Sequence, residues 1–249
     1  MGELEFKTQE QLIAECAREA ERMYTRLAGL CSDGKHQNLR SALHFAREKH
    51  KDQTRKSGEP YIIHPLTLAC YAAALGMCDD VLLAMLILHD VPEDTGVKVM
   101  DLPVDDETKA AVECMTCRQM SSESKLESKK RYYQGLAANK YATIGKGLDR
   151  CNNLSTSAQA MSKASIIKNC YETVVYLDPI LRDAKHTFPE YADKIFLIRS
   201  TLKGLVDTLS VVAGIKRLCF ETLPGDELMA RILSAKTEED LGKIPEIFP

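Results

Sequence analysis

The 249-residue sequence has no long apolar run, and this excludes several classes of protein. No stretch reaches the roughly 18 apolar residues that a membrane-spanning helix needs. The first residues, MGELEFKTQEQ, are charged where a secretory signal would be apolar, and the Ser or Thr that myristoylation requires after Met1-Gly2 is missing. The sequence therefore predicts a soluble, cytoplasmic protein that does not associate with membranes.

A strong net charge is also missing. The sequence has 33 Lys and Arg against 36 Asp and Glu, and the resulting net charge of -3 gives no general attraction for nucleic acid or for a membrane surface. An anionic ligand would have to be held by a local group of basic residues. We therefore expect a small-molecule partner and no nucleic acid.

Cysteine is plentiful, with nine residues, but the cysteines are scattered and odd in number. Without a secretion signal, this pattern indicates reduced and mostly buried thiols rather than a disulfide framework. The one CxxC pair, Cys114 and Cys117, has no second pair of cysteines or histidines nearby. Two incidental helical cysteines are therefore a better interpretation than a zinc site.

The sequence shows no convincing alternation with period two, no internal repeat and no low-complexity linker, and amphipathic segments are separated by Gly and Pro. This pattern predicts an all-α fold with one helical domain over residues 35–205, an N-terminal helical segment over 1–34 and a C-terminal helical extension over 206–249. The expected helices cover residues 9–30, 38–50, 65–75, 80–89 and onward, 106–117, 124–139, 142–155, 164–184, 191–220 and 237–243.

The apolar run 81–88 stops abruptly at His89-Asp90-Val91-Pro92-Glu93-Asp94. Residues four apart share a face of a helix, so His89 pairs with Glu93 and Asp90 with Asp94. His89 and Asp90 could hold a metal ion. Glu93 and Asp94, one turn further on, could handle a proton or a water molecule. From these residues alone, a charged helix C-terminus followed by a solvated turn is the alternative.

Three other segments could add groups to this site, and one of them is KNCYET, residues 168–173. The basic, glycine-containing segment QTRKSGEPYIIHP includes Arg55 and Lys56 and ends in His64, and KGLDRCNNL places Asp149 and Asn153 four residues apart. Two histidines and two aspartates form a plausible site for a divalent ion, and this mixture of ligands favours Mn²⁺ with water in open positions. An ordinary solvated loop and a polar helix end are the alternative interpretations.

Three motifs in this order and at this spacing, RKSGEPYIIHP, LHDVPEDT and KGLDRCNNL, resemble the HD-type hydrolase domain of the bifunctional RelA/SpoT alarmone enzymes. The resemblance covers about residues 35–205 and is closest in kind to the stand-alone small alarmone hydrolases. It implies an all-α, HD-domain helical bundle with a single metal site. In such a site one Mn²⁺ would be held by His64, His89, Asp90 and Asp149.

The resemblance also implies roles for the other polar residues of the motifs. Glu93 and Asp94 would be catalytic, positioning the attacking water and managing the proton on the leaving 3′-oxygen. The implied reaction is hydrolysis of the 3′-diphosphate of (p)ppGpp to GDP or GTP and pyrophosphate. The residues expected to contact the nucleotide substrate are Arg55, Lys56, Asn153 and Thr156.

Some positions differ from the family pattern and keep two alternatives open. Pro92 removes a helical hydrogen bond and clashes with the preceding turn, so the helix should kink or end beside the metal. Together with the altered segment 148–152, it leaves room for another substrate, such as the 2′-phosphate of NADPH, or for a catalytically weak module that binds an alarmone. The apolar positions Leu228, Ile232 and Leu233 predict packing onto the domain or onto a second subunit.

Overall fold

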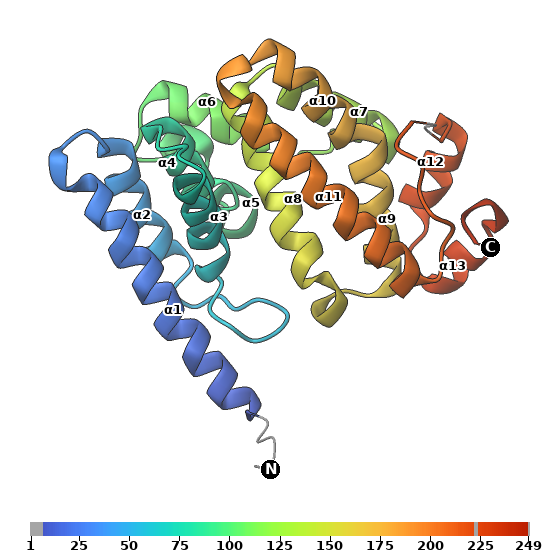
Figure 1. Ribbon diagram of the computed structural model, residues 1–249, viewed down its shortest axis with the longest axis horizontal. Helices are drawn as coiled ribbons and strands as arrows, with labels where there is room; N and C mark the ends of the chain where they lie inside the picture. The colour runs from blue at the N-terminus through green and yellow to red at the C-terminus, as the bar shows by residue number, and fades with distance from the viewer. Residues whose placement is uncertain (1–6, 222–223, 249) are drawn as a thin grey trace. The chain divides into compact units, whose positions relative to one another are not determined.

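The computed structural model describes residues 7–221 and 224–248, and these residues form helices joined by turns (Figure 1). In the described ranges the only β-type pairing is one isolated bridge between Thr54 and Pro60, so the predicted all-α class is confirmed. No helix in these ranges combines the length and the apolar character needed to cross a membrane. The contacts divide the chain into two compact units, Met1–Val112 and Glu113–Pro249.

The first unit is built around one buried helix. Helix α4 carries seven consecutive buried residues from Leu82 to Leu88, and it packs against α2 and α3. The carboxylate of Asp80, the first residue of α4, accepts hydrogen bonds from the main-chain N–H groups of Asn38 and Leu39, and so caps the N-terminus of α2. The helices of this unit are α1 (Gln9–Leu30), α2 (Gln37–Lys49), α3 (Ile63–Ala74), α4 (Asp80–Leu88) and α5 (Val91–Thr95); α6 (Asp106–Met115) runs into the second unit.

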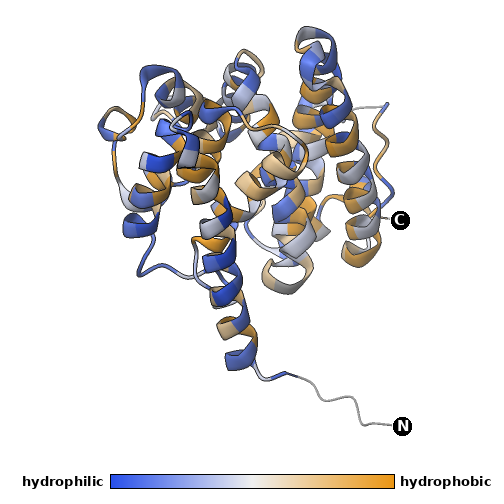
Figure 2. Ribbon diagram, turned by 60° about the vertical axis from the view of Figure 1, so that its left-hand side comes forward, coloured by the Kyte–Doolittle hydropathy of each residue, from blue (hydrophilic) through white to orange (hydrophobic). Residues whose placement is uncertain are grey.

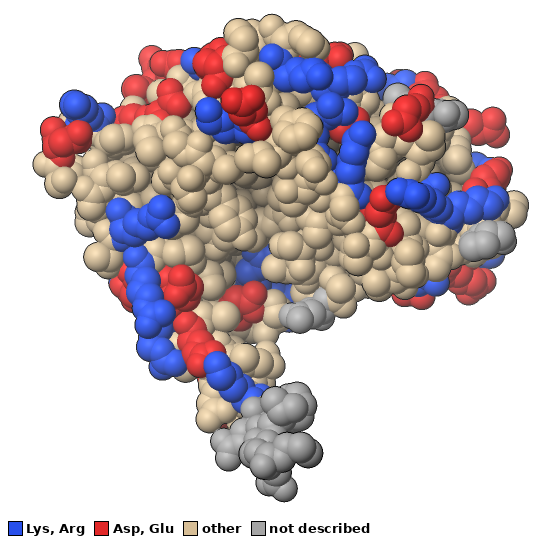
Figure 3. Space-filling view, viewed as in Figure 1, with Lys and Arg blue, Asp and Glu red and all other residues tan. Residues whose placement is uncertain are grey.

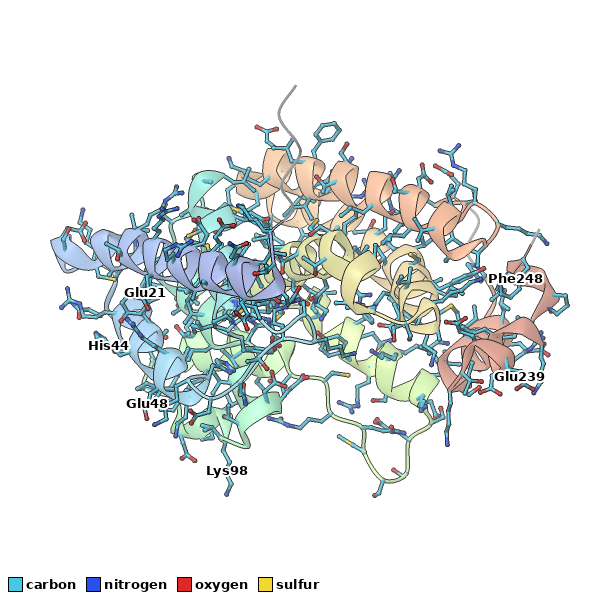
Figure 4. All side chains as sticks on the ribbon, turned by 90° about the horizontal axis from the view of Figure 1, so that it is seen from below. Glu21, His44, Glu48, Lys98, Glu239 and Phe248 are labelled. Carbon is cyan, nitrogen blue, oxygen red and sulfur yellow. The ribbon has the colours of Figure 1, made fainter. Side chains whose placement is uncertain are left out.

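Helix α1 lies on the surface of the first unit. It begins with a capping box between Thr8 and Gln11, and its buried residues are Ala20 and Leu27. Most of its other side chains are polar, so the helix is largely blue in the hydropathy view of Figure 2. Labelled side chains on the outer part of this unit include Glu21 on α1 and His44 on α2 (Figure 4).

The second unit is organised by the packing of α8 on α11. The two helices meet at Gly147, where an added Cβ would lie 2.8 Å from Cγ2 of Ile198. Only glycine therefore permits this close approach without a shift of Ile198. The helices of this unit are α7 (Lys125–Ala137), α8 (Lys140–Ala160), α9 (Lys163–Glu172), a π-helical turn (Thr173–Leu177), α10 (Asp178–Thr187), α11 (Ala192–Ala213), α12 (Asp226–Ser234) and α13 (Glu238–Gly242).

The C-terminal segment packs onto the second unit. Helix α12 lies against α7 and α9 with Ile232 and Leu233 buried, as predicted, whereas Leu228 is only half-buried and the neighbouring Met229 is buried. Further along, the Nζ atom of Lys163 lies 5.7 Å from the ring centre of Phe248, which is labelled in Figure 4.

Several predicted helix bounds were wrong. The helix expected over 191–220 ends at Ala213, because Gly214 adopts a left-handed conformation with φ of 63° and closes the helix. The helix expected over 164–184 is divided by the π-helical turn, and α12 was not predicted as a helix. The helix expected over 80–89 ends one residue earlier, at Leu88, and a separate short helix, α5, follows it.

Candidate metal centre

The chain breaks its helical path at His89 and Asp90. Helix α4 ends at Leu88, Asp90 is the N-cap residue of α5, and Pro92 lies in the first turn of α5. Proline is tolerated in a first turn because the N–H group it lacks would have no helical partner there. The predicted kink or end beside His89 is thus confirmed. Asp94 still donates its main-chain N–H to the carbonyl of Asp90 at 2.9 Å, so these two residues keep their helical spacing.

The break brings two imidazoles to one carboxylate. The Nε2 atom of His89 lies 3.1 Å from Oδ2 of Asp90, and Nε2 of His64, at the start of α3, lies 3.6 Å from the same oxygen. Both histidines are 3% exposed. Within the described residues, these three side chains form a group whose ligand atoms lie within 4.8 Å of one another.

The orientation of His89 suits metal binding. Its Nδ1 lies 2.8 Å from the carbonyl oxygen of Leu86, and because a carbonyl can only accept, Nδ1 carries the proton. In the neutral ring, Nε2 then presents a lone pair toward His64 and Asp90. A histidine whose second nitrogen donates to a main-chain carbonyl is a common arrangement for a metal ligand.

Asp90 is held in place by Tyr61. The phenolic O–H of Tyr61 donates to Oδ2 of Asp90 at 2.6 Å, a short bond of the kind expected between a hydroxyl and a charged carboxylate. Burial raises the pKa of Tyr61, and the negative charge of Asp90 raises it further, so Tyr61 stays a donor at all ordinary pH values. Tyr61 thereby fixes the carboxylate that faces both histidines.

A second layer of contacts supports Tyr61. Its ring stacks on His50, with ring centres 4.7 Å apart and planes inclined by 27°. Gln53 donates its amide N–H to the carbonyl of Asp94 at 3.0 Å, so its amide oxygen is the atom that faces Nδ1 of His50 at 2.6 Å. Burial lowers the pKa of His50, which keeps the ring neutral at pH 7. His50 and Gln53 therefore join the loop before Tyr61 to helix α5.

The residues of the first unit that were predicted to handle water or bind phosphate lie near this cluster in sequence, and all but the half-buried Arg55 are exposed. Glu93 and Asp94 are exposed on α5, directly after Asp90. Arg55 lies in a tight loop, where its main-chain N–H donates to the carbonyl of Glu59 and its Nε lies 3.8 Å from the Glu59 carboxylate. Lys56 is exposed on the same loop. These roles stay predictions.

Asp149, the fourth predicted ligand, belongs to the second unit and is 4% exposed on α8. Nζ of Lys146 lies 2.9 Å from its Oδ2, and the side-chain amide of Asn153 donates to its Oδ1 at 2.6 Å. Burial lowers the pKa of Lys146, but the Asp149 carboxylate and the nearby Tyr132 and Tyr133 together outweigh burial and raise that pKa well above its usual value. The hydroxyl of Thr156 donates to the carbonyl of Asn152. The predicted roles of these residues are not tested by these contacts.

Next to Asp149 lies a buried polar network that the sequence analysis missed. Arg150 donates to the side-chain oxygen of Asn169 at 2.6 Å and to the hydroxyl of Tyr133 at 3.1 Å, and it lies 3.4 Å from the Glu172 carboxylate. Lys129 reaches the same carboxylate at 3.1 Å. Asn169 and Glu172 lie in the segment 168–173 that the sequence singled out, but their contacts with Arg150 were not predicted.

Three of the predicted ligands thus converge, and their donor types fit a divalent transition ion. Two imidazole nitrogens and one carboxylate oxygen suit Mn, Fe, Co, Ni or Zn, and three protein ligands leave coordination positions for water or substrate. The donor set does not distinguish among these metals.

Comparison with known proteins shows which protein family this part of the chain resembles. Residues 42–144 match the HD domain family. This part of the chain is therefore similar to HD domains, and the relatives that it resembles include enzymes of the RelA/SpoT type.

Three relatives illustrate this similarity. The guanosine-3′,5′-bis(diphosphate) 3′-pyrophosphohydrolase of Aquifex aeolicus is 52% identical over 59 residues, and the bifunctional (p)ppGpp synthase/hydrolase SpoT of Escherichia coli K12 is 48% identical over 64. A probable guanosine-3′,5′-bis(diphosphate) 3′-pyrophosphohydrolase of Synechocystis is 34% identical over 119 residues. These segments cover 24%, 26% and 45% of this chain but only 8%, 9% and 16% of the relatives, respectively.

Proposed function

We propose that this protein hydrolyses the 3′-diphosphate of (p)ppGpp in a Mn²⁺-dependent reaction, releasing pyrophosphate and GDP or GTP. The observation that carries the proposal is the convergence of His64, His89 and Asp90 on one point, with Asp90 held by Tyr61. The relatives described above are named as a 3′-pyrophosphohydrolase, a probable 3′-pyrophosphohydrolase and a bifunctional (p)ppGpp synthase/hydrolase, and their similarity to this chain supports the same substrate class.

Each proposed role follows from the chemistry of the side chain. His64, His89, Asp90 and Asp149 would hold the ion, which when bound supplies positive charge and an acidified water. Arg55 and Lys56 would bind the phosphates of a substrate that the acidic chain as a whole does not attract. Asn153 and Thr156 would contact the nucleotide.

Glu93 and Asp94 would handle the proton. Water adds to the phosphorus that bears the 3′-oxygen, the bond between that phosphorus and the 3′-oxygen breaks, and pyrophosphate leaves. A carboxylate can take the proton released by the water and return one to the 3′-oxygen, so charge and atoms balance. Both side chains are exposed on α5 and so are accessible to a substrate.

The test is product analysis by ion-exchange chromatography after the protein is incubated with ppGpp, with Mn²⁺ or with chelator. We expect GDP and pyrophosphate in equal amounts, only with the metal, and not from Asp90→Asn or Asp149→Asn. Asp106→Asn is the matched control, because that carboxylate is 99% exposed at the start of α6 and should keep full activity.

A substrate panel separates the alternatives. If ppGpp stays intact while phosphate is released from NADPH, the protein hydrolyses a different phosphorylated nucleotide and not the alarmone. Saturable binding of ppGpp without any turnover by the metal-loaded protein would indicate a binding module instead. Either result contradicts the proposal.

A further inference from the structure

Helix α11 exposes a long face with few charges, on which the partly exposed Asp207 is neutralised by its ion pair with Arg217. Of its exposed residues only Asp193, in the first turn, is charged, and the apolar side chains among them are strongly exposed: 67% for Phe196, 50% for Leu197, 81% for Val211 and 59% for Val212. Figure 3 shows mostly uncharged surface over much of this helix. The other exposed positions are Ser200, Thr201, Gly204 and Thr208.

Helix α1 provides an internal reference. It has the same length, 22 residues, and also exposes one side to solvent. Surface helices normally carry charged residues on that side, and α1 follows the rule. Its exposed charged residues are Glu10, Arg18, Glu19, Glu21, Arg22 and Arg26. The face of α11 therefore departs from what this chain does elsewhere.

The residues of the α11 face are arranged symmetrically about Gly204. Phe196 and Leu197 lie eight and seven residues before it, and Val211 and Val212 lie seven and eight residues after it. At a rise of about 1.5 Å per residue, the two apolar pairs are about 11 Å from Gly204 on either side.

Small side chains fill the space between the apolar pairs. Ser200 and Thr208 lie four residues before and after Gly204, and a Cβ added at Gly204 would meet nothing within 4 Å. A helix of another molecule could therefore approach the backbone of α11 closely at its midpoint.

We propose that two copies of this chain dimerise through α11, with the two helices antiparallel and a two-fold axis near Gly204. A two-fold interface must use the same patch on both subunits, so it demands a face that is complementary to itself when reversed. In this arrangement Phe196 and Leu197 of one copy lie opposite Val211 and Val212 of the other. The small residues at the middle let the helices cross.

The charges at the two ends of α11 agree with the antiparallel direction. Glu190 and Asp193 are exposed near its beginning and Lys216 just after its end, where Arg217 is already paired with Asp207 of the same chain at 2.7 Å. Antiparallel packing brings the acidic end of each copy toward the basic end of the other, whereas parallel packing would bring like charges together.

The size of the face sets the expected affinity. Two helices about 33 Å long bury on the order of 1,000 Å² between them, at the lower end of specific interfaces. We therefore expect a reversible dimer with a dissociation constant in the micromolar range. The metal cluster lies in the other unit, so the proposal does not depend on the proposed reaction.

Sedimentation velocity over a concentration series of the full chain tests the proposal. We expect the mass to rise from one chain to two with concentration. Val211→Glu should weaken dimerisation by about a hundredfold, because each interface would then bury two unpaired carboxylates. The matched control is Leu12→Glu on α1, where an apolar residue that is 43% exposed receives the same charge. Circular dichroism checks folding, and Thr208→Arg replaces Val211→Glu if the latter loses helicity.

A charge exchange tests the direction of packing. In the antiparallel dimer Leu197→Lys combined with Val211→Glu places each new lysine opposite a new glutamate, so dimerisation should recover at least tenfold relative to Val211→Glu. A wild-type chain that stays monomeric at hundreds of micromolar, a dimer weakened equally by Leu12→Glu, or a double variant without recovery would each overturn the proposal.

Discussion

The two units of this chain each hold predicted metal ligands, and the carboxylates have different neighbours. In the first unit, Asp90 accepts a hydrogen bond from the neutral Tyr61 and faces the rings of His64 and His89. In the second unit, Asp149 lies against the ammonium group of Lys146. Imidazoles that share a carboxylate form a group suited to a metal cation, whereas the lysine already compensates the charge of Asp149. Metal binding should therefore depend most on the first group, and fold stability most on the buried charges of the second.

The largest expected effect is the loss of metal from the first unit. His89→Ala removes one of the converging nitrogen atoms, so Mn²⁺ affinity should fall by more than the roughly 10- to 100-fold typical of an outer contact. Titration of Mn²⁺ followed by electron paramagnetic resonance measures this. His44→Ala is the control, because His44 is exposed on α2 and its ring contacts Tyr24. Equal affinity in both variants would contradict the assigned cluster.

A substitution in the buried network of the second unit should lower the free energy of unfolding. Glu172→Gln leaves the guanidinium of Arg150 buried beside a neutral amide, and breaking a buried pair in this way costs about 3 kcal/mol of unfolding free energy. Urea unfolding gives the value. In Glu113→Gln, the same change at an ion pair that is about half exposed, the loss should stay below about 1 kcal/mol. Similar losses in both variants would show that burial of the network has no special weight.

Loss of the hydrogen bond from Tyr61 to Asp90 should have an intermediate effect on metal affinity. Tyr61→Phe keeps the ring that stacks on His50 and removes only the donor to Asp90. Mn²⁺ affinity should fall about 10- to 100-fold, the range typical of such supporting contacts, while unfolding changes little. Tyr71→Phe on α3, where the tyrosine is 44% exposed, serves as the control. A Tyr61→Phe protein with native affinity would show that Asp90 is oriented without this hydroxyl.

Close packing of α8 on α11 gives the next prediction. Gly147→Ala places a Cβ against Ile198, and overpacking of this kind costs about 1–3 kcal/mol. Gly135→Ala on α7, where an added Cβ meets nothing within 4 Å, should stabilise the helix slightly. Thermal unfolding of both variants measures the difference, and a stable Gly147→Ala protein would mean that Ile198 moves away freely.

The smallest expected effect is on the pH dependence of the unfolding free energy. Burial raises the pKa of Glu172, but the charges of Arg150 and Lys129 outweigh burial, and the pKa is lowered from its usual 4.5. A lowered pKa contributes stability that is present above 4.5 and is lost as pH falls through the folded value. The unfolding free energy of wild type should therefore decline more steeply below pH 4.5 than that of Glu172→Gln. Parallel curves would assign the acid dependence to other carboxylates.

The sequence predicted the class and most elements because helical periodicity and capping are local. The bounds of α1 were predicted to the residue, and the break at Pro92 followed from the missing N–H group of proline. The bounds of α11 were wrong because the left-handed turn at Gly214 is a choice among several that glycine permits. The motif residues His64, His89 and Asp90 could be named because each lies beside a recognisable helix end.

Tyr61, Gln53 and Arg150 could not be assigned from the sequence, since each acts through a partner distant along the chain. Their separations from Asp90, Asp94 and Glu172 are 29, 41 and 22 residues. Hydrogen bonds over such distances depend on how helices pack, and no local pattern encodes them. The same holds for the α11 face: the sequence predicted a helix here but not which side would be exposed, and that was decided by the packing of its other side on α8.

The sequence by itself determined that this chain is helical, that His64, His89 and Asp90 are its candidate ligands, and that proline ends the helix beside them, because these properties rest on residue type and short spacing. The tertiary structure alone decided which oxygen the two imidazoles share, which hydroxyl holds it, and which buried charges surround Arg150. Those contacts arise where segments far apart in the chain are packed together, and burial then strengthens each of them by excluding water.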